Sequence, residues 1–233
     1  MIKYNKECKA IFFDLFETLI TEWGHEKYTK NQMCKDLGIV RNEFDPLWRK
    51  IERDRYLGYI SFEDAIKYVC EKCNKSIDDF TLNKIVEKRI KTKSECFEHI
   101  DPDIFKLLDY LKGIEMKTAI ISNCSSEEVE VIKKSELSDY FDVIVLSFEC
   151  HMKKPDSCIY EQTAKKLDVD LGKSVFVGDG GSNELEGAFN VGMKAIQAKW
   201  YTNQLPTKRE RINGFDVAEK PLDIIQYLNQ LIL

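Results

Sequence analysis

Residues 9–18 read Lys-Ala-Ile-Phe-Phe-Asp-Leu-Phe-Glu-Thr. The run 9–16 is almost entirely apolar, and a short apolar run of this kind predicts a strand buried on both faces of a sheet. Asp14 interrupts it, and a carboxylate inside or directly after a buried strand is uncommon because burying a charge without a partner is costly. We therefore take Asp14 as the first candidate functional residue.

Four further apolar runs occur only in the second half of the chain, and helical patterns separate them. This alternation predicts an α/β fold, a Rossmann-like parallel sheet flanked by helices. Residues 20–95 carry several amphipathic helical patterns and no convincing strand, so we expect a helical insertion directly after the first strand. The other predicted strands are 118–121, 143–146, 174–177 and 194–198, and the predicted helices are 101–112, 125–136, 156–168 and 184–191.

Composition narrows the function classes. The 233 residues include 35 Lys and Arg against 40 Asp and Glu, a net charge of −5, which disfavours a nucleic-acid partner. No window is long and apolar enough for a membrane helix, and the first residues lack the apolar region of a signal peptide. The eight cysteines are scattered, so we expect reduced thiols in a cytoplasmic protein.

Polar residues follow the predicted strands at their carboxyl ends, where open parallel sheets bind ligands. Carboxylates placed together there would repel one another unless a cation lay between them, and hard oxygen ligands suit Mg²⁺. A lysine and a hydroxyl suit the oxygens of a phosphoryl group, and glycines let backbone N–H groups approach an anion. The residues concerned are Asp14, Ser122, Asn123, Lys154, Asp179 and Glu184.

Each of these residues also has a structural explanation. Ser122-Asn123 or Ser125 could cap a helix, and Lys154-Pro155 could simply precede one. Gly180-Gly181 alone could be a turn. Four such motifs in order, each at the end of a predicted strand, favour a single site over coincidence.

With these motifs the chain resembles the haloacid dehalogenase (HAD) superfamily, in the branch with a helical C1 cap after the first strand. Asp14-Leu15-Phe16-Glu17-Thr18 matches the family's first motif, Asp-x-Asp-x-Thr, except at its third position. Ser122, Lys154-Pro155, Gly178-Asp179 and Glu184 match the other three. The resemblance implies a core domain of residues 1–19 and 96–233 and a cap domain of residues 20–95.

The resemblance also implies roles. Asp14 would be the nucleophile that forms an aspartyl-phosphate. Mg²⁺ would be held by Asp14, the backbone oxygen of Phe16 and Asp179, with Glu184 as a ligand directly or through water.

In the same way, the resemblance implies that Ser122 and Lys154 bind the phosphoryl oxygens with help from Asn123. Thr18 would support the loop that positions Asp14, and Lys154 would screen Asp14 from the incoming anion. The activity implied is that of a Mg²⁺-dependent phosphoric monoester hydrolase acting on a small phosphorylated metabolite.

Phe16 departs from the family pattern. The family's phosphatases have a second Asp there, the general acid for the leaving group, whose loss typically costs about 10²- to 10⁴-fold in rate. Another group could replace this acid: Glu17 is adjacent to Phe16, and Glu22 or His25 could reach the site from the insertion. Glu17, Glu22, Trp23 and His25 are also candidates for substrate specificity.

Three alternatives stay open. Haloacid dehalogenases have an aromatic residue at a similar place and need no metal, although their fourth motif lacks the Gly-Asp found at 178–179. Phosphonate-cleaving members use a cap lysine, for which Lys27 or Lys30 is available. A binding module without turnover is the third alternative, and Phe16 is its only support.

The insertion contains a stretch rich in arginine, residues 48–56, which predicts one long helix. Arg49, Arg53 and Arg55 alternate there with Glu52 and Asp54, so we expect a solvated, ion-paired face. An arginine that faces a second anionic group of the substrate is the alternative.

Overall fold

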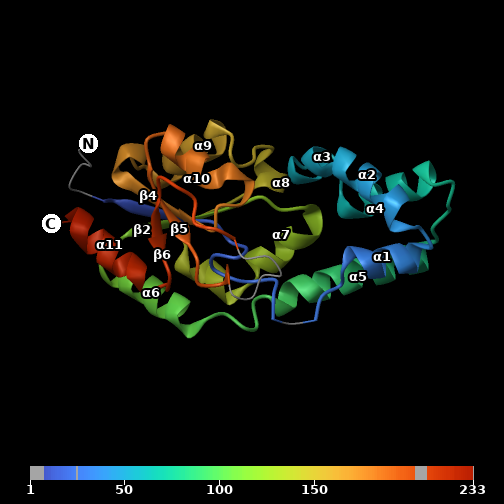
Figure 1. Ribbon diagram of the computed structural model, residues 1–233, viewed down its shortest axis with the longest axis horizontal. Helices are drawn as coiled ribbons and strands as arrows, with labels where there is room; N and C mark the ends of the chain where they lie inside the picture. Colours follow the sequence, from blue (N-terminus) through green and yellow to red (C-terminus); the bar gives the residue numbers. More distant parts are fainter. Residues whose placement is uncertain (1–7, 25, 203–208, 233) are drawn as a thin grey trace.

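The computed structural model describes residues 8–24, 26–202 and 209–232. Within these residues, a parallel sheet of six strands has the order β3-β2-β1-β4-β5-β6 (Figure 1). β1 therefore lies in the middle, hydrogen-bonded to β2 and β4. The strands are β1 (Ala10–Phe13), β2 (Lys117–Ser122), β3 (Val143–Leu146), β4 (Ser174–Gly178), β5 (Lys194–Ala198) and β6 (Asp216–Ala218).

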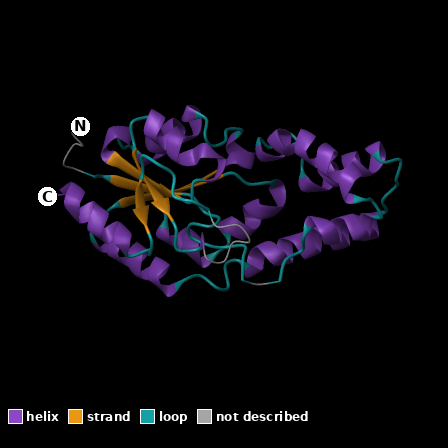
Figure 2. Ribbon diagram, in the orientation of Figure 1, coloured by secondary structure: helices purple, strands orange, loops and turns teal. Residues whose placement is uncertain are grey.

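Helices cover both faces of the sheet (Figure 2). α6 (Pro102–Gly113), α7 (Ser126–Lys133) and α11 (Asp223–Ile232) contribute to one apolar cluster, and α9 (Ser157–Leu167) and α10 (Glu184–Asn190) to the other. In β1, Ile11 and Phe13 belong to the first cluster and Ala10 and Phe12 to the second, because successive side chains of a strand point to opposite faces. The predicted α/β fold is confirmed.

The first strand is shorter than predicted, because the chain turns at its carboxyl end. The Asp14 amide still donates to the Val177 carbonyl at 2.9 Å, but the amides of Thr18, Leu19 and Ile20 all donate to the Leu15 carbonyl. The strand therefore ends at Phe13, and Asp14 keeps one hydrogen bond to β4. β6 and α11 were not predicted. The three residues of β6 give too short a pattern to recognise.

Residues 30–95, called the insertion below, form helices beside the sheet, toward the right of Figure 1. The sheet and the helices that cover it are called the core. The helices of the insertion share an apolar cluster in which the Phe44 and Trp48 rings stack 5.1 Å apart and Phe62 packs edge-on against Trp48. The single helix predicted for residues 48–56 is wrong, because Ile51 adopts φ −101° and ψ 8° and separates α2 from α3. The helices are α1 (Lys30–Leu37), α2 (Arg41–Lys50), α3 (Glu52–Tyr56), α4 (Phe62–Lys72) and α5 (Asp79–Glu95).

A buried ion-pair network joins α5 of the insertion to α7 of the core. Arg89 lies 3.3 Å from Glu127 and 3.6 Å from Glu128, and Lys93 pairs with both Glu128 and Glu22. Lys93 is only 4% exposed. Because each buried cation has a carboxylate partner, the charges hold the two parts together without leaving one unpaired.

A second contact between insertion and core lies at residues 57–59. The Leu57 carbonyl oxygen lies 2.6 Å from His151 Nδ1, and the Tyr59 ring stacks on His151. Gly58 has φ +71°, and a Cβ there would lie 2.0 Å from the carbonyl oxygen of Phe148 in α8 (Ser147–Cys150). This approach requires glycine both for its backbone conformation and for lack of space.

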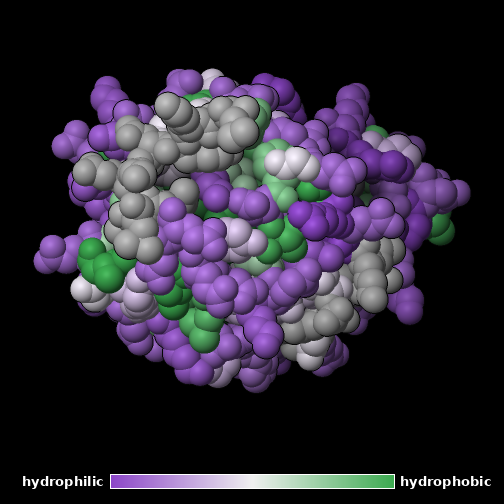
Figure 3. Space-filling view, turned by 60° about the vertical axis from the view of Figure 1, so that its left-hand side comes forward, coloured by the Kyte–Doolittle hydropathy of each residue, from purple (hydrophilic) through white to green (hydrophobic). Residues whose placement is uncertain are grey.

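The visible surface in Figure 3 is mostly hydrophilic, with hydrophobic residues in small separate patches. None of the helices in the described part of the chain has the length and apolar character needed to cross a membrane.

The contact at Gly58 gives a stability prediction with an internal control. Gly38 also has positive φ, +61°, but nothing lies within 4 Å of a Cβ added there. Both Gly→Ala variants should lose about 1–2 kcal/mol for the left-handed backbone, and Gly58→Ala a further 1–3 kcal/mol or so for the clash. Thermal unfolding should therefore show a lower Tm for Gly58→Ala than for Gly38→Ala, and equal values would contradict the close packing.

The ion-pair network should make the stability of the fold depend on pH. Burial raises the pKa of Glu22, but the charges of Lys93 and Arg89 outweigh it and lower that pKa to about 2. The contribution of Glu22 to stability should therefore be complete above its ordinary pKa of about 4.5 and be lost as the pH falls toward 2. The Tm difference between wild type and Glu22→Gln should shrink over this range, whereas Glu130→Gln, at an exposed pair, should show no such trend. A pH-independent difference would contradict this account.

Candidate active site

Three buried carboxylates meet at the carboxyl edge of the sheet. Asp14 follows β1, Asp179 follows β4 and Glu184 begins α10. One oxygen from each lies within 4.8 Å of the others, and none of the three residues is more than 7% exposed. The neighbouring positions of β1 and β4 bring together residues that are 165 positions apart in the chain.

Lys154 binds two of these carboxylates. Its Nζ pairs with Asp14 and lies 2.6 Å from Glu184 Oε2, and the residue is 1% exposed. Burial lowers the pKa of this ammonium group, but the charges of Asp14 and Glu184 outweigh burial and raise it. Lys154 therefore lies directly beside Asp14, and its contacts favour the charged form; the screening role implied for it stays a prediction.

Asn123 fixes the backbone at Lys154. Its Nδ2 donates to the Lys154 carbonyl at 2.9 Å, and its Oδ1 accepts from the Lys154 amide at 2.8 Å. The Asn123 amide thus positions the lysine. The Nδ2 group carries a second N–H and Asn123 lines the cavity described below, so the phosphoryl-binding role expected for it stays a prediction.

Thr18 supports Asp14. Its Oγ1 donates to Asp14 Oδ2 at 3.1 Å, and its carbonyl accepts from Trp200 Nε1 at 2.7 Å. Trp200 follows β5, so the turn after β1 is tied to the other half of the sheet. The supporting role implied for Thr18 agrees with these contacts.

The loop after β4 presents the other two carboxylates. The Gly181 amide donates to Asp179 at 2.8 Å, and the Gly180 amide donates to Glu184 at 3.1 Å. A Cβ at Gly178 would lie 2.2 Å from Glu184 Oε1. Glycine at 178 therefore makes room for the Glu184 carboxylate.

The proximity of the carboxylates changes their acidity. Burial, followed by repulsion from Asp14, raises the pKa of Asp179 to about 6 and that of Glu184 to about 8. Lys154 and Arg209 oppose these shifts without cancelling them. Three buried carboxylates therefore exceed the positive charge that the neighbouring side chains supply.

Ser122 lies at the end of β2, as predicted, but beneath the surface. It is 1% exposed, and its Oγ has no hydrogen-bond partner among the described residues. A buried hydroxyl without a partner is uncommon in folded proteins, and it leaves a donor free for a bound group.

A cavity of about 310 Å³ opens above these residues, between the sheet edge and the insertion. Glu17 and Glu22, two of the predicted specificity residues, line it together with Phe16. Trp23 is not among the residues that line it. Its ring contacts Lys27, whose Nζ lies 3.3 Å from the ring centre. His25 lies outside the described residues.

The Phe16 ring, which stands where the family's phosphatases have the general acid, contacts a lysine side chain. Lys93 Nζ lies 4.2 Å from the centre of the Phe16 ring, a cation–π contact inside the cavity. Glu17 accepts from Thr21 Oγ1 at 2.6 Å and from the Glu22 amide at 2.9 Å, and burial raises its pKa. Both carboxylate oxygens of Glu17 are thus already engaged in the loop.

Several cavity residues were not predicted. Arg209 lies 3.1 Å from Asp179, and Arg89, Lys93 and Glu128 come from the network between insertion and core. Their sequence positions follow no motif, and their charges alone are typical of any solvated helix.

The solvated face predicted for the arginines of residues 48–56 is wrong for one of them. Arg49 and Arg53 are exposed, but Arg55 is 6% exposed and lines the cavity. Arg53 and Arg55 lie two positions apart on α3 and so point to different sides of the helix, and Arg55 reaches Ser125 of the core.

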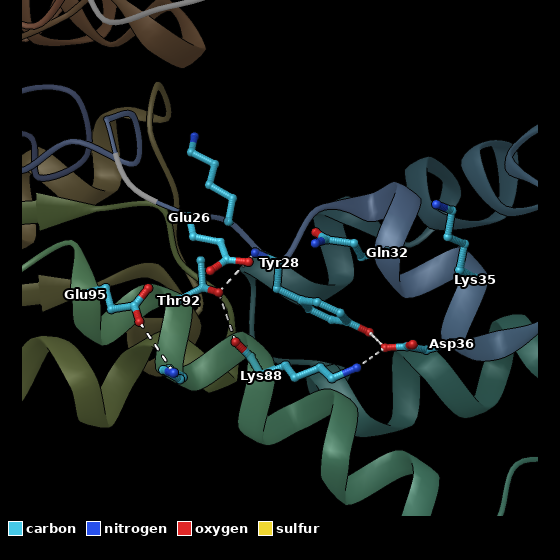
Figure 4. Close-up of a pocket in the computed structure, with 10 residues that line it drawn as sticks. Glu26, Tyr28, Gln32, Lys35, Asp36, Lys88, Thr92 and Glu95 are labelled. Carbon is cyan, nitrogen blue, oxygen red and sulfur yellow. Dashed lines mark hydrogen bonds and ion pairs between the residues drawn. The ribbon is translucent and has the colours of Figure 1, made fainter.

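A second hollow, of about 280 Å³, lies between α1 and α5 (Figure 4). Tyr28 Oη donates to Asp36 at 2.7 Å, and Lys88 Nζ donates to the same carboxylate at 2.6 Å. Asp36 is thus already bonded to Tyr28 and Lys88, and the hollow contains none of the sheet-edge carboxylates.

Comparison with known proteins agrees with this arrangement. A family model described as haloacid dehalogenase-like hydrolase matches residues 11–198. An (S)-2-haloacid dehalogenase of Pseudomonas putida is 26% identical over 186 residues, 74% of this chain and 76% of that protein. A glyceraldehyde 3-phosphate phosphatase of Pyrococcus abyssi is 25% identical over 199 residues, 82% of each chain.

A solved structure shares the fold. The 2-haloacid dehalogenase of Pseudomonas syringae pv. tomato superposes with a TM-score of 0.65 at 18% identity, over 96% of this chain and 99% of that one. The family model, the sheet order and the position of the carboxylates agree, and the chain belongs to the haloacid dehalogenase-like hydrolases.

Proposed function

We propose that this hydrolase removes a phosphoryl group from a small phosphorylated metabolite in the cytoplasm, through an aspartyl-phosphate on Asp14. The observation that carries the proposal is the buried cluster of Asp14, Asp179 and Glu184 around Lys154. A nucleophilic carboxylate, a fixed cation beside it and a surplus of negative charge are what phosphoryl transfer assisted by a metal requires.

The cluster fits Mg²⁺. Three buried carboxylates within 4.8 Å offer hard oxygen ligands, and their raised pKa values reflect a shortage of nearby positive charge. Asp14, Asp179 and Glu184 would hold the ion, with the backbone oxygen of Phe16 as a further ligand. When bound, Mg²⁺ would neutralise charge on the phosphoryl oxygens.

The protein's own groups then divide the reaction between them. An Asp14 oxygen attacks phosphorus, and the bond from phosphorus to the leaving oxygen breaks. That oxygen takes a proton from solvent, unless the leaving group is stable as an anion. Water next attacks the phosphorus of the aspartyl-phosphate, which releases phosphate and restores Asp14. Lys154 stabilises the charge on the phosphoryl oxygens, and the free Ser122 hydroxyl donates to one of them.

Two facts support a small substrate. The cavity of about 310 Å³ is at the lower end of small-molecule sites, which span about 300–1,000 Å³. The phosphatase relatives act on glyceraldehyde 3-phosphate, a three-carbon phosphate ester.

A second candidate is hydrolysis of 2-haloacids. It is favoured by the similarity to (S)-2-haloacid dehalogenases, which equals that to the phosphatases, and by the aromatic Phe16. In that reaction Asp14 would displace halide from carbon and water would then attack the Asp14 carboxyl carbon. Halide release from 2-chloropropionate without added metal is its test.

Asp14→Asn should abolish turnover. Acetyl phosphate and p-nitrophenyl phosphate have good leaving groups, so the missing general acid should not mask activity. We expect wild type to hydrolyse both with Mg²⁺ and to lose the activity with EDTA. Asp54→Asn, at an exposed position of α3, is the control and should keep it. Phosphate release by Asp14→Asn at the wild-type rate would exclude the nucleophile, and no release by wild type would favour dehalogenation, phosphonate cleavage or a binding module.

Phe16→Asp should supply the missing proton donor. The rate with glycerol 3-phosphate, an alkyl ester, should rise at least tenfold, within the 10²- to 10⁴-fold or so available to general acids. The rate with acetyl phosphate should change little. Phe16→Asn, which matches Asp in size but donates no such proton, should leave the ratio of the two rates unchanged. Equal ratios for the Asp and Asn variants would show that proton donation does not limit the reaction.

A further inference from the structure

We infer that Arg55 binds a carboxylate that the substrate carries besides its phosphoryl group. This inference rests on the proposed function, which it deepens by naming a substrate class, phosphorylated carboxylic acids. The observation that carries it is a buried guanidinium group that lines the reaction cavity without an ionic partner.

The cations of the cavity fall into two groups. Lys154, Arg209, Arg89 and Lys93 each pair with one or more carboxylates. Among the described residues, no carboxylate oxygen lies within 4.0 Å of the Arg55 guanidinium, and its buried Nε has no hydrogen-bond partner. Within the described parts of the chain, its one hydrogen bond runs from Nη1 to Ser125 Oγ at 3.4 Å.

None of the three nearby acids pairs with Arg55. Glu127 binds Arg89 through Oε1, and its buried Oε2 has no hydrogen-bond partner among the described residues and lies more than 4.0 Å from the Arg55 guanidinium. Glu128 binds Arg89 and Lys93 and also accepts from the Ser125 amide. Glu52, on the same short helix as Arg55, is exposed. Leaving a buried cation unpaired is strongly destabilising, so its partner should come from a ligand.

The surroundings hold the guanidinium in place for such a ligand. Its central carbon lies 4.1 Å from the centre of the Trp48 ring, so the group lies against the indole. Ser125, which contacts this guanidinium, is the N-cap of α7, whose N-terminus favours negative charge. A planar group with Nε and an adjacent N–H free matches the two oxygens of a carboxylate.

One cavity contains both Arg55 and the nucleophile Asp14. Arg55 and Asp14 both line its 310 Å³, so one small molecule can reach both. Arg55 comes from the insertion and Asp14 from the core. A substrate with an anion at each end would therefore bridge the two parts of the molecule.

Two three-carbon phosphates test the inference, 3-phosphoglycerate and glycerol 3-phosphate, which differ only in a carboxylate in place of a hydroxymethyl group. Affinity is measured by calorimetry with Mg²⁺ for the full chain and for Arg55→Met, with inorganic phosphate as the probe of the reacting end alone. Arg53→Met, an exposed arginine on the same helix, is the matched control.

Wild type and Arg53→Met should bind 3-phosphoglycerate about 10- to 100-fold more tightly than glycerol 3-phosphate, as expected for a hydrogen bond to a charged group. Arg55→Met should lose this preference and keep its affinity for inorganic phosphate. If thermal unfolding shows that Arg55→Met is not folded, Arg55→Lys replaces it, with a reduced preference expected because lysine lacks the fork. No preference in wild type, or the same preference in the Arg55 variant, would overturn the inference.

Failure of the proposed function has a different signature, since inorganic phosphate would then bind none of the proteins. Glycerate, which carries the carboxylate alone, decides in that case. Binding to wild type and Arg53→Met but not to the Arg55 variant would uphold the carboxylate site, and equal or absent binding would overturn it.

Discussion

Three carboxylates buried around one lysine set the terms for the rest of this molecule. Asp14, Asp179 and Glu184 repel one another, and Lys154 offsets only part of that repulsion. Such a cluster persists because rigid elements surround it: the adjacent strands β1 and β4, the amides of Gly180 and Gly181, and the Asn123 side chain that holds the lysine backbone. In the proposed reaction, this excess negative charge would be what attracts Mg²⁺ to the site.

The insertion makes a site out of this charged edge. Its helices bring Arg55, Arg89 and Lys93 over the carboxylates and close the cavity from above. Arg89 and Lys93 are neutralised by Glu127, Glu128 and Glu22, so they attach the insertion to the core, whereas Arg55 is left for a ligand. The same face of the insertion thus combines attachment and recognition, and the difference between the two roles is whether the cation has a partner.

The sequence predicts the sheet and the core of the site because both depend on local pattern. Apolar runs gave five of the strands, and the polar residues after them gave Asp14, Lys154, Asp179 and Glu184. Arg55 and Lys93 could not be found in this way, because their importance arises from burial by another element. Arg53 and Arg55 lie two positions apart on α3 and so point to different sides of the helix, and the packing of that helix, which local pattern does not reveal, decides which of them is buried.

The chemical fate of Asp14 distinguishes attack of water at phosphorus from attack at the carboxyl carbon. Wild type is quenched during turnover of acetyl phosphate in water labelled with heavy oxygen, treated with borohydride, and the peptide that contains residue 14 is analysed by mass spectrometry. An aspartyl-phosphate is reduced to homoserine, so the account predicts homoserine at position 14 and no heavy oxygen in the remaining Asp14. Heavy oxygen in the Asp14 carboxylate, or turnover without homoserine at that position, would contradict it.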